Sequence, residues 1–101
     1  MESYEKLVRD KIPEILDKKS VPYEKRTASF EEYRTELIRK LNEEIQEFFE
    51  SSGNPEELAD IIEVIEALKK LPGYENVEEL KRKKYNERGG FDKRIILKGE
   101  K

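Results

Sequence analysis

The sequence predicts an all-α protein built around an antiparallel helical hairpin. Apolar residues recur every three to four positions through residues 30–50 and again through residues 55–71. This spacing places them on one face of each helix. The four residues between the two segments, at 51–54, are two serines, a glycine and an asparagine, which are typical of a turn. Because the turn is so short, we expect the two helices to pack antiparallel through their apolar faces.

Composition favours one small domain that spans residues 1–101. Apolar residues make up 35% of the chain and charged residues 45%, so the core must be small and we expect a partner subunit to complete it. The net charge of −3 disfavours sequence-independent nucleic-acid binding, which needs a dominant positive field. No run approaches the ~18 apolar residues of a membrane span, and the N-terminus lacks a signal-peptide pattern, so we expect a cytoplasmic protein without a membrane partner.

A short first helix is expected over residues 9–19, with the sequence RDKIPEILDKK. Pro13 suits its first turn, where a missing backbone N–H does no harm, and Asp10 is a candidate N-cap. Residues 20–28 follow as a loop or a short strand.

Capping residues set the start of each hairpin helix. Ser29, with Glu32 three residues later, forms a capping box in front of the first helix. Asn54 is placed to cap the second helix, with Pro55 at its first position.

A fourth helix is expected from Asn76, its candidate cap, to the glycine pair at 89–90. A glycine there suits the left-handed conformation that often follows a helix C-terminus. The tail KRIILKGE, residues 93–100, has the composition of a short strand.

Four carboxylates lie on the hairpin helices in pairs three residues apart. They are Glu44 with Glu47 and Glu57 with Asp60. Other acidic pairs share this spacing, so the direction of each side chain matters more. At about 100° per residue, Glu44 falls inside the apolar face of the first helix and Glu57 inside that of the second. Glu47 and Asp60 lie at the borders of these faces.

Packing the two faces together would bring the carboxylates close to one another. Crowded carboxylates in apolar surroundings repel each other and lose hydration, so they bind either protons or a divalent cation. The chain has no histidine and no cysteine, so any metal must be held by oxygen ligands. Such ligands suit Mg²⁺, Mn²⁺ or Ca²⁺, and we expect Mg²⁺ near neutral pH. In the alternative interpretation, Glu44 and Glu57 are ordinary boundary residues that pair with Arg34, Lys40 or Lys69.

These residues also carry a resemblance to a known superfamily. Glu43-Glu44-Ile45-Gln46-Glu47, followed by Glu57-Leu58-Ala59-Asp60, is similar to the E-E-x-x-E and E-x-x-D motifs of the MazG-like all-α nucleotide pyrophosphohydrolases. The opening YEKLVRDKIPEIL and the closing ERGGFDKRIIL resemble its small phosphoribosyl-ATP pyrophosphohydrolase-like branch. The resemblance covers nearly the whole chain. The spacer between the two motifs is short for the superfamily, which requires a tight turn.

The resemblance implies a four-helix MazG-like arrangement and a reaction. Enzymes of this superfamily cleave a nucleoside triphosphate between its α and β phosphates, giving a monophosphate and pyrophosphate. Carried over by position, the Mg²⁺ ligands are Glu44, Glu47, Glu57 and Asp60, with Mn²⁺ as a possible substitute. Glu47 is our candidate to orient or deprotonate the attacking water. Relatives are dimers or tetramers with sites near subunit boundaries, so we expect a homodimer or homotetramer, with a preference for the dimer.

Two basic segments could supply cations for the phosphates. One is KLVRDK near the N-terminus and the other is the last helix. The resemblance favours four of their residues as substrate ligands: Arg9, Lys11, Lys84 and Arg88. The alternative for each is an ordinary solvated helix face.

Three functional hypotheses follow. The leading one is a Mg²⁺-dependent pyrophosphohydrolase that clears non-standard or excess nucleotides. The second is a phosphoribosyl-ATP pyrophosphohydrolase of histidine biosynthesis. The third is a non-catalytic nucleotide-binding or helical oligomerisation module, which the four carboxylates disfavour because such a module has no need to bury acids.

Overall fold

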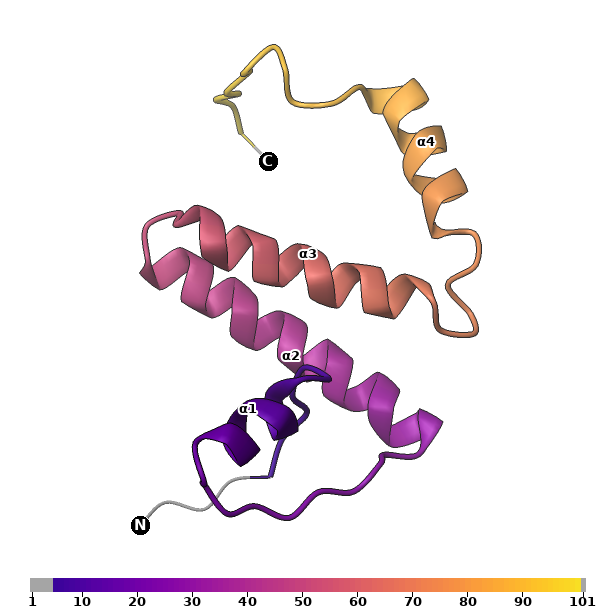
Figure 1. The fold of residues 1–101 in the computed structure, drawn as a ribbon. Coiled ribbons are helices and arrows are strands. Elements are labelled where there is room, and N and C mark those ends of the chain that lie inside the picture. Colours follow the sequence, from indigo (N-terminus) through magenta and orange to yellow (C-terminus); the bar gives the residue numbers. More distant parts are fainter. Residues whose placement is uncertain (1–4, 101) are drawn as a thin grey trace.

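A computed structural model describes residues 5–100, and this part of the chain is all-helical (Figure 1). It contains four α-helices and no strand in the described range. They are α1 (Ile12–Lys18), α2 (Phe30–Glu50), α3 (Pro55–Lys69) and α4 (Val77–Arg88). Helices α2 and α3 lie side by side as an antiparallel hairpin, which confirms the predicted fold class and its central element (Figure 1).

The predicted caps of the hairpin helices are confirmed. Ser29 Oγ accepts a hydrogen bond of 3.2 Å from the backbone N–H of Glu32. Asn54 Oδ1 accepts one of 2.9 Å from the backbone N–H of Glu56. The turn between the helices is as tight as the short spacer requires, because Ser52 and Gly53 both take positive φ angles, 59° and 90°.

The core lies between α2 and α3 and is small, as the composition predicted. The buried apolar side chains of the described residues are Leu37, Ile61, Val64 and Leu71. Several residues of the predicted apolar faces remain exposed: Phe30, Ile45, Leu58, Ile62 and Ile65. Each apolar face is wider than the strip that one neighbouring helix can cover, so part of it stays open to solvent.

Helix α1 begins later than the sequence suggested. It starts at Ile12, with Lys11 at the N-cap position and no side-chain capping bond, so the prediction that Asp10 caps this helix is wrong. The backbone N–H of Ile12 instead donates to the carbonyl of Arg9, which closes a turn before the helix. Pro13 lies in the first turn, as predicted. Residues 20–28 form a loop without strand structure.

The C-terminal part of the structure agrees with the sequence-based predictions only in outline. Asn76 occupies the N-cap position of α4, but its side chain makes no capping bond. Gly89 ends the helix with φ 77° and ψ −178°, a conformation open to glycine but different from the predicted left-handed helical one. The predicted strand in residues 93–100 is wrong, since no strand of the described chain pairs with it.

Helix α4 stands apart from the hairpin (Figure 1). An ion pair between Lys69 and Glu78 joins it to the end of α3, whereas α2 and α3 form the extensive helix contact of the described chain. The radius of gyration is 18.1 Å, compared with about 13 Å for a compact domain of 100 residues. None of the described helices is long and apolar enough to cross a membrane.

Candidate metal centre

Three carboxylates converge on the hairpin. Glu44 from α2 faces Glu57 and Asp60 from α3, and one oxygen from each lies within 4.8 Å of the other two. Glu57 and Asp60 point the same way because residues three apart lie on one face of a helix. The predicted convergence is therefore confirmed for these three of the four carboxylates.

Glu44 is the one buried charged residue of the described chain, with 7% of its surface exposed. Its Oε2 atom is buried without a hydrogen-bond partner among the described residues, and the same is true of Glu57 Oε2. A buried polar atom without a partner destabilises the fold by about 1–3 kcal/mol, and more when the group is charged. Two such oxygens from facing helices are a suitable donor set for a hard divalent cation.

The environment of Glu44 favours its protonated form. Burial raises the pKa of this carboxyl above its ordinary value, and the neighbouring carboxylate of Glu47 raises it further. Lys40 opposes both effects, because its Nζ lies 3.4 Å from Glu44 Oε1. The raised pKa is the expected consequence of crowding carboxylates around an apolar surface when no metal is present.

In the alternative interpretation, Glu44 and Glu57 are ordinary boundary residues paired with nearby cations, and the structure confirms only one such pair. Lys40 does pair with Glu44. Arg34 instead donates to the hydroxyl of Tyr74, and Lys69 pairs with Glu66 and Glu78. The single lysine leaves Glu44 Oε2 and Glu57 Oε2 without partners, so ordinary surface pairing does not account for the cluster.

Glu47 lies beside Glu44 but outside the three-carboxylate group, and its side chain is exposed. The side-chain directions inferred from the helical period anticipated this difference, since they placed Glu44 within the apolar face and Glu47 at its border. Its assignment as fourth ligand and as catalytic base stays a prediction.

Arg9 reaches the cluster from the N-terminal segment. Its Nη2 donates a hydrogen bond of 2.6 Å to Asp60 Oδ1, and both side chains are half exposed. Arg9 was predicted to bind phosphate, and the structure places it beside Asp60, one of the three clustered carboxylates; its role as a phosphate ligand stays a prediction. Nothing in the sequence pattern pointed to Asp60 as its partner.

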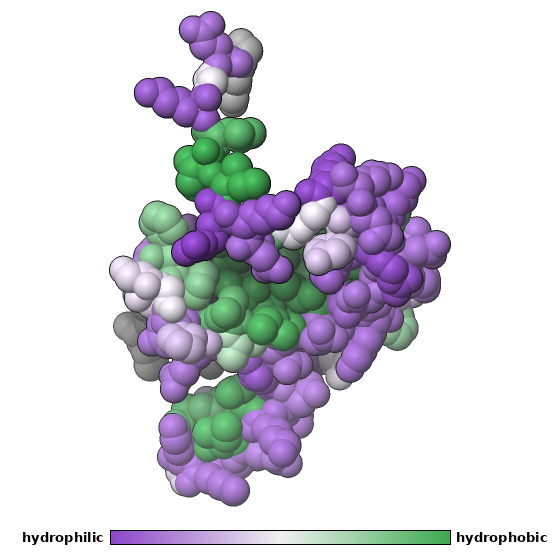
Figure 2. All heavy atoms as spheres, turned by 90° about the horizontal axis from the view of Figure 1, so that it is seen from above, coloured by the Kyte–Doolittle hydropathy of each residue, from purple (hydrophilic) through white to green (hydrophobic). Residues whose placement is uncertain are grey.

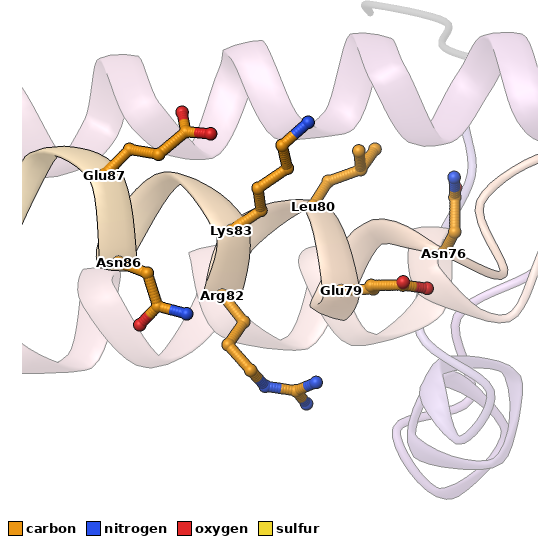
Figure 3. Close-up of a pocket in the computed structure, with 7 residues that line it drawn as sticks. All are labelled: Asn76, Glu79, Leu80, Arg82, Lys83, Asn86 and Glu87. Atoms are coloured by element: carbon orange, nitrogen blue, oxygen red, sulfur yellow. The ribbon is translucent and has the colours of Figure 1, made fainter.

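The other predicted phosphate ligands lie elsewhere on the surface. Lys11 is exposed before α1, and Lys84 and Arg88 are exposed on α4, away from the hairpin contact. A hollow of about 590 Å³ runs along α4 (Figure 3). It is lined by Asn76, Glu79, Leu80, Arg82, Lys83, Asn86 and Glu87. Neither the carboxylates nor the four predicted phosphate ligands line this hollow.

Comparisons with known proteins add no identification. A scan of protein-family models and searches of curated proteins and of solved structures find no match to this chain. The resemblance to the MazG-like enzymes therefore rests on the sequence motifs alone.

Proposed function

We propose that this protein is a Mg²⁺-dependent nucleotide pyrophosphohydrolase with a MazG-like arrangement. It would hydrolyse a nucleoside triphosphate between the α and β phosphates to a monophosphate and pyrophosphate. The observation that carries the proposal is the buried Glu44, whose Oε2 atom lacks a hydrogen-bond partner and which faces Glu57 and Asp60 across the hairpin. Clearing non-standard nucleotides is the role that we favour.

The residues present fit a hard divalent cation. Glu44, Glu57 and Asp60 would hold it. Glu47, which lies beside Glu44, is the fourth ligand in the proposal. Bound Mg²⁺, or Mn²⁺ in its place, would neutralise phosphate charge and make a water molecule more acidic.

The remaining chemistry falls to side chains of this chain. Glu47 is exposed beside the cluster, so it can orient a water and take its proton, and the chain has no histidine for this task. Arg9 presents a planar guanidinium beside Asp60, which suits two oxygens of a phosphate. Its bond to Asp60 must open or be shared when a phosphate binds. Lys11, Lys84 and Arg88 are the further cations in the proposal.

A helical oligomerisation module is the second candidate, and one observation favours it. Many large apolar side chains are exposed on the hairpin and the C-terminal segment, which a single chain leaves uncovered. A homodimer would cover these side chains whether the protein is an enzyme or an oligomerisation module. Finding a homodimer would therefore not distinguish the two candidate functions.

A turnover panel tests the proposal. The full chain is incubated with common and modified nucleoside triphosphates and with phosphoribosyl-ATP, in Mg²⁺ or in chelator. Products are resolved as monophosphate with pyrophosphate or as diphosphate with phosphate. Glu44→Gln removes a buried ligand, and Glu63→Gln, an exposed acid on the same hairpin, is the matched control.

We expect Mg²⁺-dependent pyrophosphate release that Glu44→Gln lowers at least ~100-fold, the scale of losing a metal-orienting group, while Glu63→Gln leaves it unchanged. Turnover restricted to phosphoribosyl-ATP would assign the histidine-pathway activity. No turnover of any substrate would contradict the enzymatic proposal and favour the oligomerisation module.

A further inference from the structure

The chain exposes more surface than a compact protein of its size. Its accessible surface is 9954 Å². A compact monomer of 12.0 kDa would expose about 6,000 Å² by the usual scaling of surface with mass. The excess of about 4,000 Å² is several times the ~800 Å² that each partner contributes to a standard protein interface.

The C-terminal arm, which we define as residues 77–100, is one of the exposed parts of the chain. Helix α4 has no buried residue, and the segment after it carries four large apolar side chains that are 69–97% exposed. They are Phe91, Ile95, Ile96 and Leu97. Four apolar side chains so close together in sequence are expected to be covered in the working form of a protein.

A matching apolar surface lies on the hairpin. Six side chains there are 39–80% exposed, three on each helix: Ile38, Ile45 and Phe49, and Leu58, Ile62 and Ile65. We call these six the hairpin outer face. On each helix they recur at three-, four- or seven-residue spacing, which forms a second apolar stripe beside the one that packs in the hairpin. Seen from the side of α3 and α4, apolar surface occupies the middle of the molecule (Figure 2).

The elements that carry the two surfaces also differ in charge. Helices α2 and α3 contain twelve acidic and four basic residues, whereas the C-terminal arm contains eight basic and five acidic residues. Opposite charge around two apolar surfaces favours their association and sets its orientation.

The connector before α4 holds the arm away from its own hairpin. Leu71 is buried in the core, and the Tyr74 hydroxyl accepts a hydrogen bond of 2.8 Å from Arg34 Nη2. The Arg34 guanidinium also lies 5.4 Å from the centre of the Tyr74 ring. These contacts fix both sides of the turn that contains Gly73, whose φ is 97°, and so they set the direction in which α4 leaves.

We propose that the C-terminal arm of one copy docks on the hairpin outer face of a second copy, and that the exchange is reciprocal. A two-fold dimer of this kind covers both apolar surfaces with one type of contact and leaves no open end for further assembly. The inference goes beyond the proposed function and does not depend on catalysis.

Isotope-labelled cross-linking tests which copy the arm contacts. Equal amounts of ¹⁵N-labelled and unlabelled full chain are mixed, allowed to exchange, and treated with a carbodiimide, which joins lysines to carboxylates in direct contact. We expect peptides that link arm lysines to acids of α2 or α3, with about half of them joining a labelled to an unlabelled chain. If no arm-to-hairpin peptide joins a labelled to an unlabelled chain, the arm folds on its own hairpin. That result would overturn the proposal.

Sedimentation over a range of concentrations provides the second test. The wild-type chain should sediment at twice 12.0 kDa at micromolar concentration. Ile96→Asp with Leu97→Asp should raise the dissociation constant at least ten-fold, while helical circular dichroism is unchanged because both side chains are exposed in the single chain. Val21→Asp, at a half-exposed apolar residue outside both surfaces, is the matched control and should remain dimeric. A monomeric wild type, or a dimer that survives the arm substitutions, would overturn the proposal.

Discussion

Arg9 Nη2 donates a hydrogen bond to Asp60 Oδ1 over 2.6 Å, and so joins the segment before α1 to the carboxylates of the hairpin. The two residues are 51 positions apart in the sequence. The contact places a permanent positive charge at the edge of three crowded carboxylates, where it occupies an oxygen that a metal could otherwise use.

Arg9→Ala should therefore change the affinities for metal and for nucleotide in opposite directions. An exposed ion pair contributes about 0–1 kcal/mol, so freeing Asp60 should tighten binding of Mn²⁺ alone by up to ~5-fold. Loss of a charged hydrogen bond to phosphate, worth about 1.5–3 kcal/mol, should weaken nucleotide binding by at least ~10-fold. Calorimetric titrations measure both, with Arg39→Ala as the control, since Arg39 pairs with Glu36 on α2. Weaker Mn²⁺ binding in Arg9→Ala would contradict this account.

Glu44→Gln should stabilise the metal-free protein and remove its response to metal. The substitution keeps the shape of the side chain but removes a buried charge that lacks a full set of partners, and we expect a gain of about 1–3 kcal/mol. Thermal unfolding in chelator and in Mg²⁺ measures both effects. Glu63→Gln should behave like the wild type, and a Glu44→Gln protein that still gains stability from Mg²⁺ would place the metal elsewhere.

The stability of the metal-free protein should also depend on pH through Glu44. Burial, and then Glu47, raises the pKa of this carboxyl in the folded state, whereas Lys40 lowers it. A carboxyl with a raised pKa stabilises the fold fully below the unfolded value of about 4.3, and this contribution is lost as the pH rises through the folded value.

The difference in unfolding free energy between Glu44→Gln and wild type should therefore grow as the pH rises from the unfolded pKa through the folded pKa of Glu44, and level off above it. Unfolding in chelator from pH 4 to pH 8 measures it. The stabilisation by Mg²⁺ should grow in parallel, because the metal replaces the proton. A difference that is constant with pH would show that Glu44 does not titrate as described.

Two asparagines allow a matched test of helix capping. Asn54 Oδ1 accepts the backbone N–H of Glu56 at the start of α3, whereas Asn76 makes no side-chain bond at the start of α4. Asn54→Ala should cost about 1 kcal/mol, or roughly 4–8 °C in Tm. Asn76→Ala should cost much less. Equal losses in the two variants would show that the capping bond is not what stabilises the start of α3.

The hairpin was predictable because its signals are local. The apolar period, the caps at Ser29 and Asn54 and the short turn all act within a few residues, and the structure follows them. The inward direction of Glu44 follows from the same period. For this reason a buried carboxylate could be expected from sequence.

The parts that were not predicted depend on distant contacts. The partner of Arg9 is set by how the N-terminal segment crosses the hairpin, which no local pattern encodes. Residues 93–100 have strand-like composition, but a strand forms only beside another strand, and the described chain offers none. The position of α4 follows from the contacts of Leu71 and Tyr74 rather than from its own sequence.

The most direct test of the central claim is a count of divalent ions bound by the full chain. Mn²⁺ titration followed by electron paramagnetic resonance reports free and bound ion without any substrate. We predict saturable binding that Glu44→Gln and Asp60→Asn each weaken at least ~10-fold and Glu63→Gln does not. Absence of saturable binding, or binding that is equal in all four proteins, would show that Glu44, Glu57 and Asp60 do not form a metal site.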